Sequence, residues 1–144
     1  MKILAIDPGL TVGYSILEVE GDDVIDLLVE QERTNEKPYV TEPMRLLAEA
    51  GVDVLVMEDF VGAGYRTKES SYTLKMIGGF EFAAMERGIP VVMQTNIMRK
   101  AWIKDATALY RVWKEVLPCH HGKDALAHAL RYLKGLGEIW SRPG

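Results

Sequence analysis

The stretch ILAIDPGLTVGYSILE at residues 3–18 decides which fold the chain can adopt. Residues 2–7 (KILAID) form a short apolar run that predicts a buried strand, and a Pro-Gly turn ends it. Residues 12–19 predict a second strand, and a Gly-Asp-Asp turn leads into a third strand at 24–32. We therefore expect the fold to begin with an antiparallel meander of three strands.

Helical and strand patterns alternate through the rest of the chain. The expected elements are a helix at 43–50 (Thr41 as N-cap, Gly51 as stop), a strand at 52–57, a polar loop at 62–69, a helix at 70–86, a strand at 89–93, a helical region from 94 to 116 and a last helix at 121–133. The run at 52–57 is continuous and apolar, so we expect that strand to be buried on both faces, and we expect the strand at 89–93 to be buried as well. This order indicates an α/β protein with a mixed five-stranded sheet flanked by helices.

Length and composition fit one domain spanning residues 1–144. The chain is 48% hydrophobic, which is enough to bury a core without disulfides, and it contains no internal repeat or long linker. Its single cysteine, Cys119, excludes an intramolecular disulfide and favours a reducing compartment. The first apolar run is too short for a signal peptide or a membrane span. We expect a soluble cytoplasmic protein with no membrane partner.

The charge distribution is uneven. The net charge of −4 is unusual for a nucleic-acid binder, but a cluster of catalytic acids lowers the total while basic residues gather elsewhere. The basic residues form two groups: Arg66, Lys68 and Lys75, and then Arg99, Lys100, Lys104, Arg111, Lys114 and Lys123. Taken alone, such groups are more often solvated surface than a binding site.

Acidic residues stand at the ends of the predicted elements. Asp7 ends the first strand and Glu58 ends the fourth. If these strands are parallel neighbours, both carboxylates meet at one edge of the sheet, where their repulsion favours a divalent cation such as Mg²⁺. His121 and Asp124 lie three residues apart on one face of the last helix. These four side chains suit two-metal phosphodiester hydrolysis.

Each acid also has an ordinary structural explanation. Asp7 suits a turn, Glu58 suits a surface position, and Asp124 suits the first turn of a helix, where the helix dipole favours a negative charge. The metal-site interpretation rests on the coincidence of all of them at element ends that face one region.

Three stretches together resemble the RuvC family of Holliday junction resolvases, in particular its short phage-type members. ILAIDPGLTVGYSILE is similar to the family's first strand and hairpin, VLVMEDF to the strand that ends in its catalytic glutamate, and HHGKDALAHALRYL to its C-terminal helix. The resemblance runs over nearly the whole chain in the right order. It implies a ribonuclease-H-like fold and a structure-selective endodeoxyribonuclease that uses Mg²⁺ or Mn²⁺, with two ions per site. It implies that Asp7, Glu58, His121 and Asp124 are the catalytic metal ligands.

The resemblance also implies partners and contact residues. The family is a homodimer that nicks both strands of branched DNA, and the long helix SSYTLKMIGGFEFAAMERG at 70–88 is similar to its interface helix. Gly78 and Gly79 within that helix suggest a close approach, either by the sheet or by a partner helix. The implied DNA-contacting residues are Arg99, Lys100 and Lys104, with Phe60 and Tyr65 as stacking candidates. The polar loop GAGYRTK, which carries Arg66 and Lys68, could also follow a DNA backbone electrostatically.

Other functions remain open on the sequence alone. The same fold could act on flaps or forks, and a catalytically silent relative could bind DNA only. A sugar-kinase or actin-like ATPase shares the opening motif but needs a much longer chain. A zinc site at Cys119, His120, His121 and His128 lacks the usual ligand spacing. We expect His128 to pack near the sheet or to be exposed, outside the metal site.

Overall fold

The structure is a computed structural model that describes residues 1–21, 23–34, 41–59, 68–94, 104–108 and 120–135. Among them, no helix is both long enough and apolar enough to cross a membrane.

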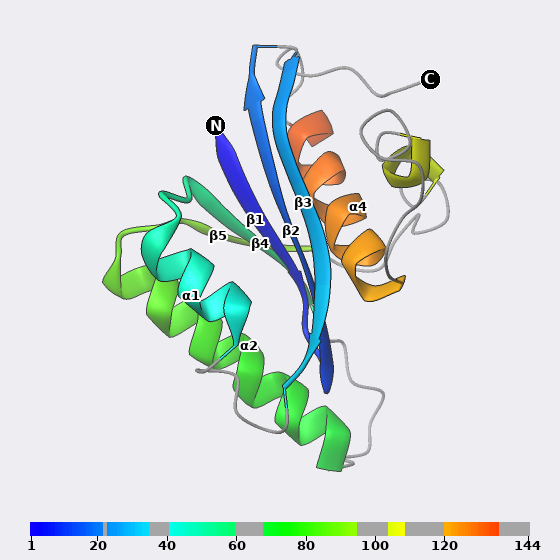
Figure 1. Ribbon diagram of the computed structural model, residues 1–144. Coiled ribbons are helices and arrows are strands. Elements are labelled where there is room, and N and C mark those ends of the chain that lie inside the picture. Colours follow the sequence, from blue (N-terminus) through cyan, green and yellow to red (C-terminus); the bar gives the residue numbers. More distant parts are fainter. Residues whose placement is uncertain (22, 35–40, 60–67, 95–103, 109–119, 136–144) are drawn as a thin grey trace.

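Five strands form one mixed sheet in the order β3-β2-β1-β4-β5 (Figure 1). The strands are β1 (Lys2–Asp7), β2 (Thr11–Glu20), β3 (Asp23–Arg33), β4 (Val54–Glu58) and β5 (Val91–Gln94). The pairs β1–β2 and β2–β3 are antiparallel, whereas β1–β4 and β4–β5 are parallel. The expected meander and the expected mixed five-stranded sheet are therefore confirmed, and the strands that end in Asp7 and Glu58 are parallel neighbours.

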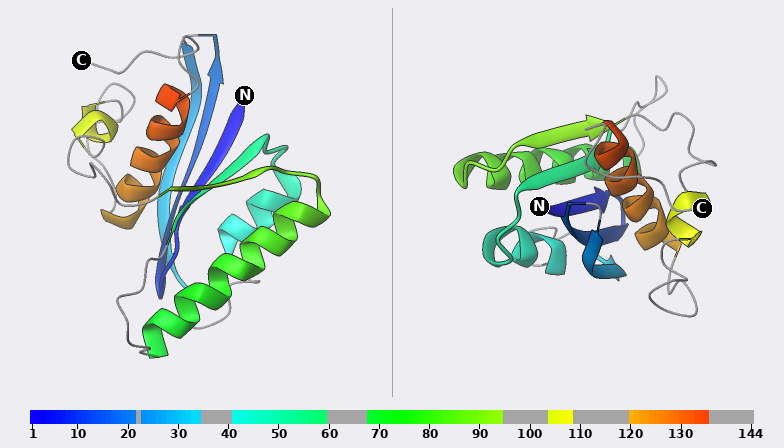
Figure 2. Two further views of the ribbon diagram at one scale, coloured as in Figure 1. Left: turned by 180° about the vertical axis from the view of Figure 1, so that it is seen from behind. Right: turned by 90° about the horizontal axis from the view of Figure 1, so that it is seen from above.

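Helices cover both faces of this sheet. Helix α1 (Glu42–Glu49) and helix α2 (Lys68–Glu86) lie on one face, and helix α4 (His120–Gly135) crosses the other (Figures 1 and 2). A short helical segment at 104–108 lies within the region where the sequence predicted a helix. The N-cap of α1 is Thr41, as expected, although its side chain makes no capping hydrogen bond.

Alternation along each strand divides the interior into two cores. In β1, Ile3 and Ala5 pack against α4, whereas Leu4 and Ile6 pack against α1 and α2. Successive side chains of a strand point to opposite faces. Asp7 therefore continues the series that faces α4.

Four details of the sequence prediction need correction. Strand β5 is half-buried at Val91–Met93 rather than buried, because it is the edge strand. Helix α2 begins at Lys68, inside the expected loop, and β4 begins at Val54. Helix α4 begins at His120, so Asp124 lies just beyond the first turn. The dipole explanation for Asp124 is weakened accordingly, since that effect fades within the first turn.

Candidate metal centre

A single row of residues crosses the sheet beneath the start of α4. The register pairs Asp7 with Gly13 and Gly13 with Gln31. On the other side of β1, the pairing of Ile6 with Met57 places the next residues, Asp7 and Glu58, side by side. Glu58 in turn pairs with Gln94. The row therefore runs Gln31, Gly13, Asp7, Glu58, Gln94, with every member on the face toward α4.

The glycine in this row allows α4 to lie directly on the sheet. A Cβ atom at Gly13 would overlap the backbone carbonyl of His121 and lie 2.7 Å from the backbone nitrogen of Gly122. The backbone N–H of His121 donates to Gln31 Oε1 at 3.3 Å, so a side chain from β3 satisfies one of the free amides at the helix start. These contacts fix where the first turn of α4 lies relative to Asp7.

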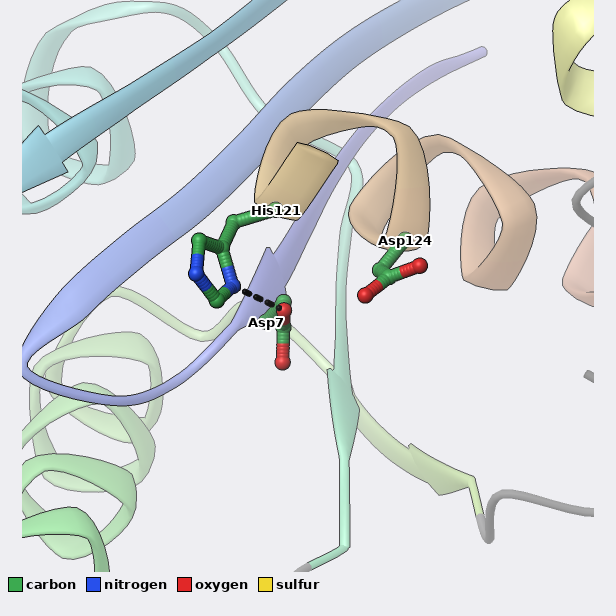
Figure 3. A group of neighbouring side chains, drawn as sticks. All are labelled: Asp7, His121 and Asp124. Carbon is green, nitrogen blue, oxygen red and sulfur yellow. Dashed lines mark hydrogen bonds and ion pairs between the residues drawn. The ribbon is translucent and has the colours of Figure 1, made fainter. Parts of the chain in front are cut away.

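Three of the four proposed ligands come together at this point (Figure 3). His121 Nδ1 is 3.2 Å from Asp7 Oδ2. One ligand atom each from Asp7, His121 and Asp124 can be chosen so that all lie within 4.8 Å of one another. Asp7 and Asp124 are both 8% exposed, which is unusual for carboxylates unless a partner or a cation compensates the charge.

The fourth proposed ligand, Glu58, lies beside this group and is not part of it. Its strand position is next to Asp7 and on the same face, but its Oε1 points to the next turn of α4, 3.8 Å from His128 Nε2. Its side chain is 24% exposed, so it remains accessible to solvent. The structure thus brings Asp7, His121 and Asp124 together and holds Glu58 one strand away.

His128 and Gln94 are polar residues at this site that were not predicted to belong to it. His128 is 8% exposed, and its Nδ1 lies 2.8 Å from Gln94 Oε1. The expectation that His128 packs near the sheet is met. His121, Asp124 and His128 have the spacing i, i+3 and i+7, which places them on one face of the helix. This spacing is the sequence signal that His128 lies over the same row of strand residues. Gln94 leaves no such signal, because its role depends on which strand lies beside β4.

The donor set fits a divalent ion. Carboxylate oxygens are the ligands that Mg²⁺ takes in proteins, and an imidazole beside them is accepted more readily by Mn²⁺. Two ligand atoms on one ion with bonds of about 2.1 Å lie roughly 3 to 4.2 Å apart. The separation of His121 Nδ1 and Asp7 Oδ2 falls within that range. The residues present are therefore compatible with a metal ion.

Most of the predicted DNA-contacting residues fall outside the described part of the chain. These are Phe60, Tyr65, Arg66, Arg99 and Lys100, together with the side chain of Lys68. Lys104 is described and is exposed on the helical segment at 104–108. Ala106 of that segment is buried in the same core as α4, so Lys104 lies on the site's side of the sheet. Cys119, part of the zinc alternative, also lies outside the described residues.

The glycines of α2 do not contact the sheet. Within the described residues, no atom outside the local helix backbone lies within 4 Å of a Cβ built on Gly78 or Gly79. The first of the two interpretations, close approach by the sheet beneath, is therefore wrong. Both glycines face outward beside the exposed side chains of Leu74, Phe82 and Met85, which are 50%, 60% and 70% exposed.

Comparisons with known proteins agree with this architecture. No family model matches the chain, and no curated protein matches it. Among solved structures, the chain is similar to RuvC of Thermus thermophilus in complex with a Holliday junction substrate, with 23% identity and a TM-score of 0.65. It is also similar to a second Thermus thermophilus RuvC structure, with 22% identity and a TM-score of 0.66. Both comparisons cover 100% of this chain and 100% of the other. The chain has a RuvC-like fold of the ribonuclease-H type, as the sequence motifs implied.

Proposed function

We propose that residues 1–144 act as one RuvC-like nuclease domain, which resolves Holliday junctions by metal-dependent, paired and symmetric nicking. The observation that carries this proposal is the group formed by Asp7, His121 and Asp124 next to Glu58. Asp7 and Glu58 lie at the carboxyl ends of adjacent parallel strands, where α/β folds place their sites, and the start of α4 brings His121 and Asp124 to the same edge. The four-way junction bound to the similar Thermus thermophilus RuvC suggests the substrate class.

The four residues would have complementary roles. Asp7 neighbours Glu58 across the sheet and also lies in the group with His121 and Asp124, so it is the ligand that both halves of a two-ion centre would share. Asp124 and His121 hold the α4 side, and Glu58 holds the β4 side. Two bound ions would supply an activated water and a stabilised leaving oxygen. Because Asp7 and Asp124 are little exposed, water screens their charges weakly, and they would interact more strongly with ions bound at the site.

The ions are proposed to be Mg²⁺ or Mn²⁺. Three carboxylates favour either ion, whereas the imidazole of His121 favours Mn²⁺. Both ions should therefore support cleavage, and Mn²⁺ should bind the protein more tightly.

A homodimer through α2 would present two such sites to one junction. Leu74, Gly78, Phe82 and Met85 recur at intervals of three and four residues, which places them on one face of the helix. An apolar stripe with a flat glycine surface at its centre suits close packing against a second copy. The exposure of its three large side chains supports this proposal.

Basic residues near the site are proposed to contact DNA phosphates. Lys104 is exposed on the site's side of the sheet, and Arg99 and Lys100 precede it closely in the sequence. The proposal extends to Arg66 and Lys68, and to the aromatic side chains of Phe60 and Tyr65 as stacking groups. Loss of one phosphate contact should reduce the slope of log affinity against log salt by about 0.9 on duplex arms.

The decisive experiment is cleavage of labelled four-way, flap and linear duplex DNA in Mg²⁺ and in Mn²⁺. We expect paired nicks at symmetric positions on the four-way junction and little cleavage of the linear duplex. The matched control is Asp7→Asn, which keeps the side-chain shape but removes the charge. Asp7→Asn should bind the junction without cutting it.

The other outcomes separate the alternatives. Preference for flaps or forks over the four-way junction would assign the chain as a branched-DNA nuclease of the same fold. Junction binding without cleavage in either metal would assign it as a catalytically silent relative. Equal cleavage by the chain and by Asp7→Asn would remove the proposed centre from the reaction.

A further inference from the structure

His128 occupies a position in the site that packing alone does not explain. It lies on the same face of α4 as His121 and Asp124, one turn further along, and it is 8% exposed. Its neighbours in sequence, Ala127 and Ala129, are small core residues of the same helix. An apolar residue would fill this position between helix and sheet, yet the chain places an imidazole over the ends of β4 and β5.

Gln94 fixes the orientation of this imidazole. His128 Nδ1 lies 2.8 Å from Gln94 Oε1, and a carbonyl oxygen can only accept, so Nδ1 carries the proton and donates. Gln94 is itself 8% exposed, and its backbone carbonyl accepts from Asp59 N–H at 2.7 Å. The acceptor is therefore held by the sheet. In the neutral ring, Nε2 is then left with its lone pair.

The nitrogen that carries this lone pair lies close to a carboxylate. His128 Nε2 is 3.8 Å from Glu58 Oε1, beyond hydrogen-bonding distance. A lone pair and a carboxylate oxygen are both electron donors, so neither stabilises the other directly. A cation between them would accept an electron pair from each. The separation of His128 Nε2 and Glu58 Oε1 lies within the roughly 3 to 4.2 Å expected for two ligand atoms on one ion with bonds of about 2.1 Å.

The arrangement at His128 repeats the one at His121. In both cases a histidine of α4 faces a carboxylate at the end of a parallel strand, Asp7 for His121 and Glu58 for His128. His128 also shows the feature that metal-binding imidazoles usually have, a second ring nitrogen that donates to a fixed acceptor. The contact of His128 Nδ1 with Gln94 Oε1 gives the ring this orientation.

We propose that His128, oriented by Gln94, is a metal ligand on the Glu58 side of the centre. The centre then has one strand carboxylate and one helix imidazole on each side, with Asp124 as a further carboxylate. This inference rests on the proposed metal centre and adds a ligand to it. It implies that nitrogen donors favour Mn²⁺ on both sides rather than on the His121 side only.

The test measures how the DNA-free protein binds Mn²⁺. Calorimetry gives the affinity, and pulsed EPR detects the coupling between bound Mn²⁺ and the nitrogen atoms of its ligands. The chain has three histidines, so an untagged His120→Ala background leaves His121 and His128 as its only imidazoles. Adding His121→Asp should leave nitrogen coupling from one imidazole. Adding His128→Gln as well should abolish that coupling. His128→Gln alone should lower the affinity of the weaker Mn²⁺ site about 10- to 100-fold, and Gln94→Leu about tenfold.

The control and the contrary outcomes keep the two proposals separate. Leu130→Ala removes a fully buried apolar side chain from the same helix and should lower stability without changing nitrogen coupling. Loss of all coupling in the His121→Asp protein, with Mn²⁺ still bound, would overturn the role of His128 and leave the proposed nuclease intact. His121→Asp could instead prevent Mn²⁺ binding altogether. In that case His128→Gln is compared in the background that keeps His121, and unchanged nitrogen coupling there would also overturn the role of His128. Failure of the unsubstituted chain to bind Mn²⁺ would overturn the whole centre.

Discussion

The two faces of the sheet are built from the same strands but differ in what their strand ends carry. On the face covered by α1 and α2, Ile6 and Met57 are fully buried apolar residues. On the face covered by α4, the next residues along the same strands are Asp7 and Glu58. On the α1–α2 face, the apolar core extends to Ile6 and Met57. On the α4 face, the apolar core gives way to a row of polar residues beneath the first two turns of α4. A shift of one residue along a strand therefore separates a residue of the apolar core from a residue of the candidate site.

The largest expected effect is the loss of DNA cleavage when the carboxylates on the α4 face of the sheet are replaced. Asp7→Asn and Glu58→Gln should each reduce junction cleavage at least about 10²-fold, because the loss of one electrostatic group at a reaction centre typically lowers the rate about 10²- to 10³-fold. Thermal stability of the metal-free protein should hold or rise, because repulsion between neighbouring carboxylates is removed. Cleavage rates and unfolding curves measured on the same samples test both statements.

The matched control lies one residue away on the opposite face. Ile6→Val removes one buried methylene and should cost about 0.5–1.5 kcal/mol of stability with little change in the cleavage rate of the folded protein. If Ile6→Val reduced cleavage as strongly as Asp7→Asn, the two faces would not have separate roles.

A second prediction concerns the glycine that lets α4 approach the sheet. Gly13→Ala forces its Cβ into the backbone of His121, so we expect a stability loss of about 1–3 kcal/mol or more. Mn²⁺ affinity should fall too, because the first turn of α4 carries His121 away from Asp7. Gly79→Ala is the control, since among the described residues no atom outside the local helix backbone lies within 4 Å of the added methyl, and it should stabilise α2 by up to about 1 kcal/mol. Equal effects of the two substitutions would show that α4 does not rest on Gly13.

A third prediction sharpens the metal chemistry on the α4 face. His121→Asp replaces an imidazole with oxygen donors, so cleavage should persist and the preference should move toward Mg²⁺. His121→Ala should lose most activity in both metals. Parallel rates in Mg²⁺ and Mn²⁺ check this, and a His121→Ala protein that cuts as fast as the unsubstituted chain would remove His121 from the centre.

A fourth prediction addresses the outer surface of α2. Gly79→Leu should leave the fold stable, because Gly79 faces outward, while it weakens self-association by about tenfold or more. Analytical ultracentrifugation at several concentrations measures this effect. A chain that is monomeric at micromolar concentration yet still makes paired nicks would contradict the proposed dimer.

The smallest effect is expected at the exposed surface of α1. Arg45 pairs with Glu42 and with Glu49, and the hydrogen bond from Arg45 lowers the pKa of Glu42. A carboxyl group whose pKa is lowered on folding stabilises the folded state at pH values above its ordinary pKa. This stabilisation is lost as the pH falls through the lowered pKa. Arg45→Ala should therefore raise the pKa of Glu42 in an NMR titration. The effect on stability should be slight, since both groups are exposed and water screens them.

Local pattern was sufficient for most of the fold. The apolar run at 2–7 and the turns around it predict the meander, and the continuous run ending at Glu58 predicts a central strand, because strand periodicity and turn chemistry act over a few residues. The apolar run at 89–93 predicts a buried strand, and that prediction is wrong for the half-buried residues of β5. A sequence cannot show which apolar strand has a neighbour on one side only.

The candidate site divides in the same way. The sequence by itself determined the residue types, Asp7 and Glu58 at strand ends and His121 and Asp124 on one face of a helix, because each choice is made within one element. Only the tertiary structure decided that Gly13 lets α4 settle on the sheet, that Gln31 meets its first turn, and that Gln94 and Glu58 enclose His128. Those contacts depend on strand order and helix placement, which arise from packing between segments up to about a hundred residues apart. No local pattern of side chains encodes distances between such segments.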